Sequence, residues 1–135
     1  MKINLDRIDS GFGMLAHAGN HQVFLDNSED FGGQDIGFRP MQLMLISLAG
    51  CSAIDIISIL EKGRHTIRTY SSEVHAVRRK EMPRIFEKID LIVTVDTDAT
   101  DGALDRAVEL TKTKYCSAFA VLEASASIHL TIIRA

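Results

Sequence analysis

One stretch decides the fold of this chain: Met41-Gln-Leu-Met-Leu-Ile-Ser-Leu-Ala-Gly-Cys-Ser-Ala-Ile-Asp-Ile-Ile-Ser-Ile-Leu60, in which Asp55 is the only charged residue. The pattern predicts one long helix that begins at Pro40 and runs to about Lys62, with Gly63 as the residue after its end. Its apolar residues cover every side of the helix instead of forming a stripe. Such a helix either spans a membrane or is enclosed by protein.

The polar residues of the stretch argue against a membrane span, although about 20 residues would be enough to cross a bilayer. Gln42, Gly50, Asp55 and three serines interrupt the apolar run, and the rest of the chain contains amphipathic strands. A single small sheet can cover only one side of this helix. We therefore expect a second copy of the chain to cover the other side, which predicts an obligate homodimer with this helix at its centre.

Length and composition indicate one domain over residues 1–135, with enough apolar residues for a core. The chain is 46% hydrophobic and 24% charged, and its net charge of −3 does not suggest a nucleic-acid partner. Its first residues lack an apolar signal core, so we expect a cytoplasmic protein without a membrane partner. A permanent disulfide is uncommon in that compartment, where a transient catalytic or sensing one is more typical.

The remaining periodicity predicts an α+β fold. A second helix should begin at Thr100 or Asp101 and continue over 115–122, with a break near Cys116. Alternation in the strand over 84–97 places Ile85, Glu87, Ile89, Leu91, Val93 and Val95 on one face. Gly19-Asn20 suits a two-residue hairpin turn. The predicted strands are 2–8, 12–18, 21–26, 66–79, 84–97 and 127–133.

The two cysteines, Cys51 and Cys116, are the candidate reactive residues. A thiol buried in an apolar helix is normally inert, because burial raises its pKa and only the thiolate is a good nucleophile. Asp55, one turn after Cys51, would disfavour the thiolate further if it is ionised and close. An activating cation must come from another segment, and spacing alone cannot choose among the candidates. From the residues alone, two buried structural cysteines are favoured over a redox pair. The candidate cations are Arg39, Arg64, Arg78, Arg79 and Arg84.

Three segments together resemble the OsmC/Ohr family of thiol-dependent hydroperoxide reductases, and within it a YhfA-like branch. They are Pro40-Met-Gln-Leu-Met-Leu-Ile-Ser-Leu-Ala-Gly-Cys-Ser-Ala-Ile-Asp55, Arg78-Arg-Lys-Glu-Met-Pro-Arg-Ile-Phe-Glu-Lys-Ile89 and Lys114-Tyr-Cys-Ser117. The resemblance implies an intertwined homodimer in which antiparallel sheets wrap around two long central helices. That expectation agrees with the dimer inferred above from the apolar helix.

The resemblance also implies an activity, namely antioxidant, peroxiredoxin-like reduction of organic hydroperoxides in a stress response. Cys51 would be oxidised to a sulfenic acid, and Cys116 would condense with it to a disulfide. A dithiol reductant, either a lipoyl protein or a small thiol, would then open the disulfide. We expect the two Cα atoms within about 7 Å of each other. A helix restarting at Cys116, next to Lys112 and Lys114, would lower the pKa of its thiol. No cofactor is expected, and the scattered histidines of the sequence do not predict a metal site.

The sequence departs from the family pattern at the residues that activate the reactive thiol. In family peroxidases a glutamate follows the helix-opening proline and positions an arginine. Here Met41 occupies that place, and residues 10–15 contain no arginine. We therefore predict slow turnover with a substitute arginine, Arg78 or Arg79 ahead of Arg39. The alternative is a non-catalytic dimeric module that binds a small apolar ligand in the pocket where the family's peroxidases would bind peroxide.

Overall fold

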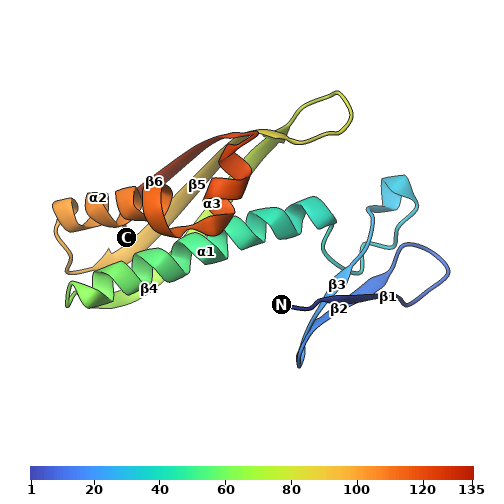
Figure 1. Ribbon diagram of the computed structural model, residues 1–135, viewed down its shortest axis with the longest axis horizontal. Helices are drawn as coiled ribbons and strands as arrows, with labels where there is room; N and C mark the ends of the chain where they lie inside the picture. Colours follow the sequence, from blue (N-terminus) through green and yellow to red (C-terminus); the bar gives the residue numbers. More distant parts are fainter. The chain divides into compact units, whose positions relative to one another are not determined.

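A computed structural model describes all residues, 1–135, and confirms an α+β fold with two three-stranded sheets and three α-helices. The chain divides into two compact units, residues 1–45 and residues 46–135. Figure 1 labels their elements and colours them along the sequence, from blue at the N-terminus to red at the C-terminus. That residues 1–135 act as a single domain stays a prediction.

The smaller unit is an antiparallel sheet followed by a loop. Its strands are β1 (Asn4–Arg7), β2 (Met14–Ala18) and β3 (His21–Leu25), paired in that order. The turn between β2 and β3 is the expected one, with Gly19 at a positive φ of 61°. None of the hydrophobic side chains in residues 1–45 is buried in the single chain. This unit therefore lacks a hydrophobic core of its own.

The loop after β3 is organised by the carboxylate of Asp26, which is only 3% exposed. It accepts hydrogen bonds from the backbone N–H groups of Asn27 at 2.7 Å, Gln34 at 2.9 Å and Ile36 at 3.3 Å. Burial alone would raise the pKa of Asp26, but these three donors outweigh it and hold the pKa below its usual value. The ionised carboxylate thus closes the loop.

We expect Asp26→Asn to lower the melting temperature at neutral pH, because an amide offers these donors only one acceptor oxygen. Since the folded pKa of Asp26 lies below its unfolded value, its contribution is present above about pH 4 and is lost as the pH falls through the folded pKa. Melting curves between pH 3 and 7 should therefore converge for the two proteins at the acidic end. Asp30→Asn, at an exposed position in the same loop, is the matched control. Parallel curves at every pH would contradict this role.

Helix α1 (Pro40–Lys62) has the predicted bounds. At its start, Gln42 Oε1 accepts the backbone N–H of Arg39 at 3.0 Å, which is half of a capping box. Only the residue predicted to follow the helix end in the left-handed conformation was wrong, because this role falls to Arg64 and not to Gly63. Gly63 still donates to Ile59 in helical fashion, and Arg64 takes the left-handed conformation with φ of 63°.

One face of α1 is buried in the single chain, through Leu48, Ser52, Ile56 and Leu60, four residues apart. Ile54, on another face, is 69% exposed. By length and composition alone, α1 could also cross a membrane, but this evidence is weak because the core helix of a soluble protein meets the same criteria. The single chain therefore covers this apolar helix from one side only.

The larger unit is built on a mixed sheet of β4 (Ile67–Arg78), β5 (Phe86–Thr97) and β6 (Ser127–Arg134), with β5 in the centre. The β4 and β5 strands are antiparallel, whereas β6 lies parallel to β5. Parallel pairing requires a long crossover, and the helical segments between β5 and β6 provide it. Buried side chains alternate along β5, so one face of the sheet forms the core.

The face predicted for β5 was wrong at its first residues. Val77 pairs with Lys88, but the next residue of β4, Arg78, pairs with Phe86. Glu87 is therefore an extra residue in a bulge, and it is exposed while Phe86 is buried. Alternation in the sequence cannot reveal such a shift, because a bulge moves the following side chains to the opposite face.

The crossover consists of α2 (Asp101–Leu110), a π-helical turn (Thr111–Tyr115) and α3 (Ser117–Glu123). Thr100 caps α2 as predicted, and its hydroxyl oxygen accepts the N–H of Ala103 at 3.2 Å. The predicted break at Cys116 is confirmed, since this residue is extended, with φ of −74° and ψ of 102°.

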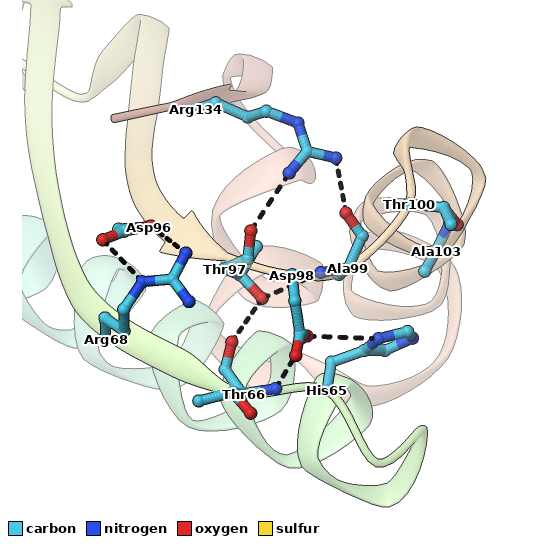
Figure 2. Close-up of polar contacts among 10 residues, drawn as sticks. All are labelled: His65, Thr66, Arg68, Asp96, Thr97, Asp98, Ala99, Thr100, Ala103 and Arg134. Carbon is cyan, nitrogen blue, oxygen red and sulfur yellow. Dashed lines mark hydrogen bonds and ion pairs between the residues drawn. The ribbon is translucent and has the colours of Figure 1, made fainter.

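A polar cluster fixes the start of this crossover (Figure 2). Asp98 Oδ1 accepts the backbone N–H of Thr66 at 2.9 Å, and the hydroxyl of Thr97 donates to the Thr66 carbonyl at 2.6 Å. Arg134, at the end of β6, donates to the carbonyls of Thr97 and Ala99. These bonds tie the α1–β4 turn to the β5–α2 turn and thereby fix where α2 begins.

Candidate functional site

Three side chains meet in the larger unit: Cys51 and Asp55 from α1, and Cys116 from the break before α3. The two sulfur atoms and a carboxylate oxygen all lie within 4.8 Å of one another. Both cysteines are free thiols. The sulfur atoms of the two cysteines singled out in the sequence therefore lie close together, although the residues are distant in the chain.

Cys116 is the more enclosed thiol, with 3% of its surface exposed. Its sulfur caps α3 by accepting the backbone N–H of Phe119 at 3.3 Å, and the Ser52 hydroxyl lies 3.5 Å away. Burial raises the pKa of this thiol and outweighs the bonds from Ser52 and Phe119, while the neighbouring Cys51 raises it further. The expectation of a lowered pKa was wrong: a helix does restart here, but burial dominates.

Cys51 is half-buried and therefore more accessible than Cys116. It lies in the interior of α1, where helical geometry also places Asp55, four residues later, on the same side. The two cysteines thus differ in environment, one partly open and one enclosed and hydrogen-bonded. This asymmetry is what a pair of thiols with different tasks requires.

Asp55 is the third member of the site. Burial raises the pKa of its carboxyl group, and its Oδ2 is buried without a hydrogen-bond partner. The structure contains no ion pair to this carboxylate. The four-residue spacing from Cys51 signalled its position, whereas nothing in the sequence identified Ser52 as a neighbour of Cys116.

The candidate activating arginines make their contacts elsewhere. Arg78 donates to the carbonyl of Arg84 at 2.6 Å, and Arg79 donates to that of Pro83 at 2.5 Å, both within the connection between β4 and β5. Arg39, in the smaller unit, forms an ion pair with Asp35 at 3.0 Å. No guanidinium forms a hydrogen bond to either sulfur within the single chain.

A pocket of about 480 Å³ lies next to the site, and Asp55 is the one site residue that lines it. It lies between α1 and α2, and Tyr115 also lines it. Its lining includes the apolar residues Ile59, Leu60 and Leu110 as well as basic side chains. The site therefore adjoins a space that could accommodate a small molecule with apolar and anionic parts. The basic residues are Lys62, His65 and Arg106.

Comparison with known proteins assigns the class. The OsmC-like protein family model matches residues 32–131. The chain therefore belongs to the OsmC-like family. Within it, the chain is similar to protein YhfA of Escherichia coli K12, with 38% identity over 112 residues that cover 82% of this chain and 81% of YhfA. The resemblance to a YhfA-like branch is thus confirmed.

Solved structures share the fold. A hypothetical protein from Aquifex aeolicus matches with a TM-score of 0.87 and 25% identity, over 99% of this chain and 95% of that one. An organic hydroperoxide resistance protein OsmC from Legionella pneumophila, described as a predicted redox protein, matches with a TM-score of 0.73 and 12% identity, over 98% and 96% of the two chains. At this identity the second likeness concerns the fold alone. The chain thus shares its fold with a protein described as an organic hydroperoxide resistance protein.

Proposed function

We propose that the protein is a thiol-dependent reductase of organic hydroperoxides that works through a two-cysteine cycle. The observation that supports this most is the approach of two free thiols to within 4.8 Å, one accessible and one enclosed. Two cysteines that serve only as core residues have no need to adjoin each other.

In the first step, the thiolate of Cys51 attacks the terminal oxygen of the hydroperoxide. An S–O bond forms and the O–O bond breaks, so Cys51 becomes a sulfenic acid and the leaving alkoxide takes a proton from water to become an alcohol. Cys51 is assigned this step because it is the more accessible thiol.

In the second step, the sulfur of Cys116 attacks the sulfenic sulfur. The S–S bond forms, and the hydroxide of the sulfenic acid leaves as water with the proton of the Cys116 thiol. A dithiol reductant, such as a lipoyl protein or a small thiol, then supplies two electrons and two protons and restores both cysteines. The enclosure of Cys116 suits this step, because an enclosed thiol meets the neighbouring sulfur before it meets peroxide.

The rate should be low, because Cys51 lacks a guanidinium partner within the single chain. Each pKa unit of lost stabilisation lowers the thiolate population about tenfold. To serve as a substitute cation beside Cys51, an arginine would first have to give up its present partner. Arg78 and Arg79 each bond a carbonyl of the β4–β5 connection, and Arg39 pairs with Asp35. An apolar environment at Cys51 should favour organic hydroperoxides over hydrogen peroxide.

Stopped-flow oxidation of the reduced protein by cumene hydroperoxide tests this function. We expect wild type to lose two thiols for each hydroperoxide consumed, and to react more slowly with hydrogen peroxide. The Cys51→Ser variant should not react, because a hydroxyl is not a comparable nucleophile at neutral pH. Equal rates for wild type and Cys51→Ser would refute the proposed enzyme.

The pocket beside Asp55 favours a second candidate, a non-catalytic dimeric module that binds a small ligand with an apolar part. Under this alternative the cysteines contribute only to packing. Ligand binding would then persist in a variant without either cysteine. Cumene hydroperoxide would oxidise the two thiols of wild type no faster than it oxidises an ordinary free thiol in solution.

The working state we propose is a cytoplasmic homodimer, with no nucleic acid or membrane as partner. Residues 1–45 bury no hydrophobic side chain in the single chain, although this unit exposes Ile3, Leu5, Phe12 and Phe24. A sheet of this size without a core, disulfide or metal is not stable alone. A second copy would cover this surface and the exposed face of α1 together.

A further inference from the structure

We propose that Cys51, Asp55 and Cys116 form a binding site for one zinc ion per chain. The three side chains offer two sulfur atoms and one carboxylate oxygen, all within 4.8 Å of one another. The sequence predicted no metal site because its histidines are scattered, but this set uses no histidine. The binding itself does not depend on the proposed peroxide chemistry, although both use the same thiols.

The electrostatics of the cluster call for a cation. All three groups are neutral or negative, and Asp55 forms no ion pair. Its Oδ2 is buried and lacks a hydrogen-bond donor, an arrangement that is costly for a carboxylate. A divalent ion would displace two thiol protons and leave a net charge of −1 at the site, with every ligand atom engaged.

The ligand set selects the metal. Two thiolates exclude Mg²⁺ and Ca²⁺, which prefer oxygen ligands, whereas Zn²⁺ accepts both sulfur and carboxylate oxygen. Zinc–sulfur bonds of about 2.3 Å at tetrahedral angles separate two sulfurs by roughly 3.8 Å. Since the two sulfurs lie within 4.8 Å of each other, they need to approach by at most about 1 Å to reach this separation.

The surroundings hold the ligands in place. Cys51 and Asp55 stand four residues apart on α1, the spacing at which two side chains of one helix can share a metal ion. The sulfur of Cys116 already accepts the Phe119 N–H and lies 3.5 Å from the Ser52 hydroxyl, and such outer bonds orient a thiolate ligand. Three protein ligands leave the fourth position to water.

Metal titration of the reduced, metal-free protein tests the site. With Co²⁺ as the probe, we expect a thiolate-to-metal charge-transfer band that saturates at one ion per chain, and Zn²⁺ should displace the Co²⁺. Cys51→Ser and Cys116→Ser should each remove most of the band. Asp55→Asn should weaken Zn²⁺ binding at least about tenfold, as loss of even an outer-shell partner does. Asp105→Asn, at an exposed position on α2, is the matched control and should bind as wild type does.

A rescue variant separates ligation from structural damage. Asp55→Cys replaces the oxygen ligand by a third thiolate, so it should restore tight binding and strengthen the charge-transfer band by about half. Circular dichroism of each variant monitors folding. No binding by wild type, or equal Zn²⁺ affinity of wild type and Asp55→Asn, would overturn the proposal. Stopped-flow oxidation of the metal-free protein tests the peroxidase separately, so either idea can fail alone.

Discussion

The Cys116→Ser variant should react once with cumene hydroperoxide and then stop. Without the second thiol, the sulfenic acid at Cys51 cannot condense to an intramolecular disulfide, so it should persist and react with dimedone. We expect one dimedone adduct per chain in the variant and almost none in wild type, measured by intact-protein mass spectrometry. Disulfide formation should fall to background.

This substitution is well suited to the test because it preserves the local structure. The sulfur of Cys116 caps α3 through the Phe119 N–H, and serine is among the preferred residues at such a position. A loss of chemistry in Cys116→Ser therefore cannot be attributed to a lost helix cap. A wild-type level of disulfide in the variant would show that another pathway, such as a bond between chains, resolves the sulfenic acid.

Ile54→Lys should dissociate the proposed dimer and unfold much of the protein. Ile54 is 69% exposed in the single chain, so a lysine there would be harmless in a monomer. If a second copy covers this face of α1, the same lysine is buried without a partner, which destabilises by several kcal/mol, roughly 3–5. Analytical ultracentrifugation and thermal melting measure the two effects.

Val121→Lys is the matched control, because Val121 has the same exposed fraction, 69%, on α3. We expect this variant to remain dimeric with an unchanged melting temperature. A soluble, folded monomer for wild type at micromolar concentration would refute enclosure of α1 by a second copy. Dissociation by Val121→Lys with no effect of Ile54→Lys would place the interface on α3 instead.

Much of this fold could be predicted because its elements carry strong local signals. Pro40 marks the start of α1, Thr100 caps α2, and the helical pattern breaks at Cys116, as the structure confirms. The errors concern features that depend on pairing or burial. The bulge at Glu87 arises from the way β5 pairs with β4, and the alternation of residues within β5 carries no information about that pairing.

For the candidate site, too, some features could be predicted from the sequence and others could not. The closeness of Cys51 and Cys116 was expected through family resemblance, not from the residues, which favoured two separate core thiols. Spacing on one helix placed Asp55 near Cys51. The direction of the Cys116 pKa shift could not be predicted, because burial of this thiol depends on the packing of elements distant in sequence.

The sulfur of Cys116 caps the N-terminus of α3 and also lies close to Cys51, so oxidation of this pair should change the backbone dynamics of α3. In the proposed disulfide, the Cys116 sulfur would turn toward Cys51, and we expect the Phe119 amide to lose the bond that it donates in the reduced protein. The first turn of this seven-residue helix then frays more often, and its amide protons exchange with solvent faster. Hydrogen exchange at Phe119 would thus report the redox state of the protein, and a reductant could recognise the loosened segment as the mark of an oxidised chain.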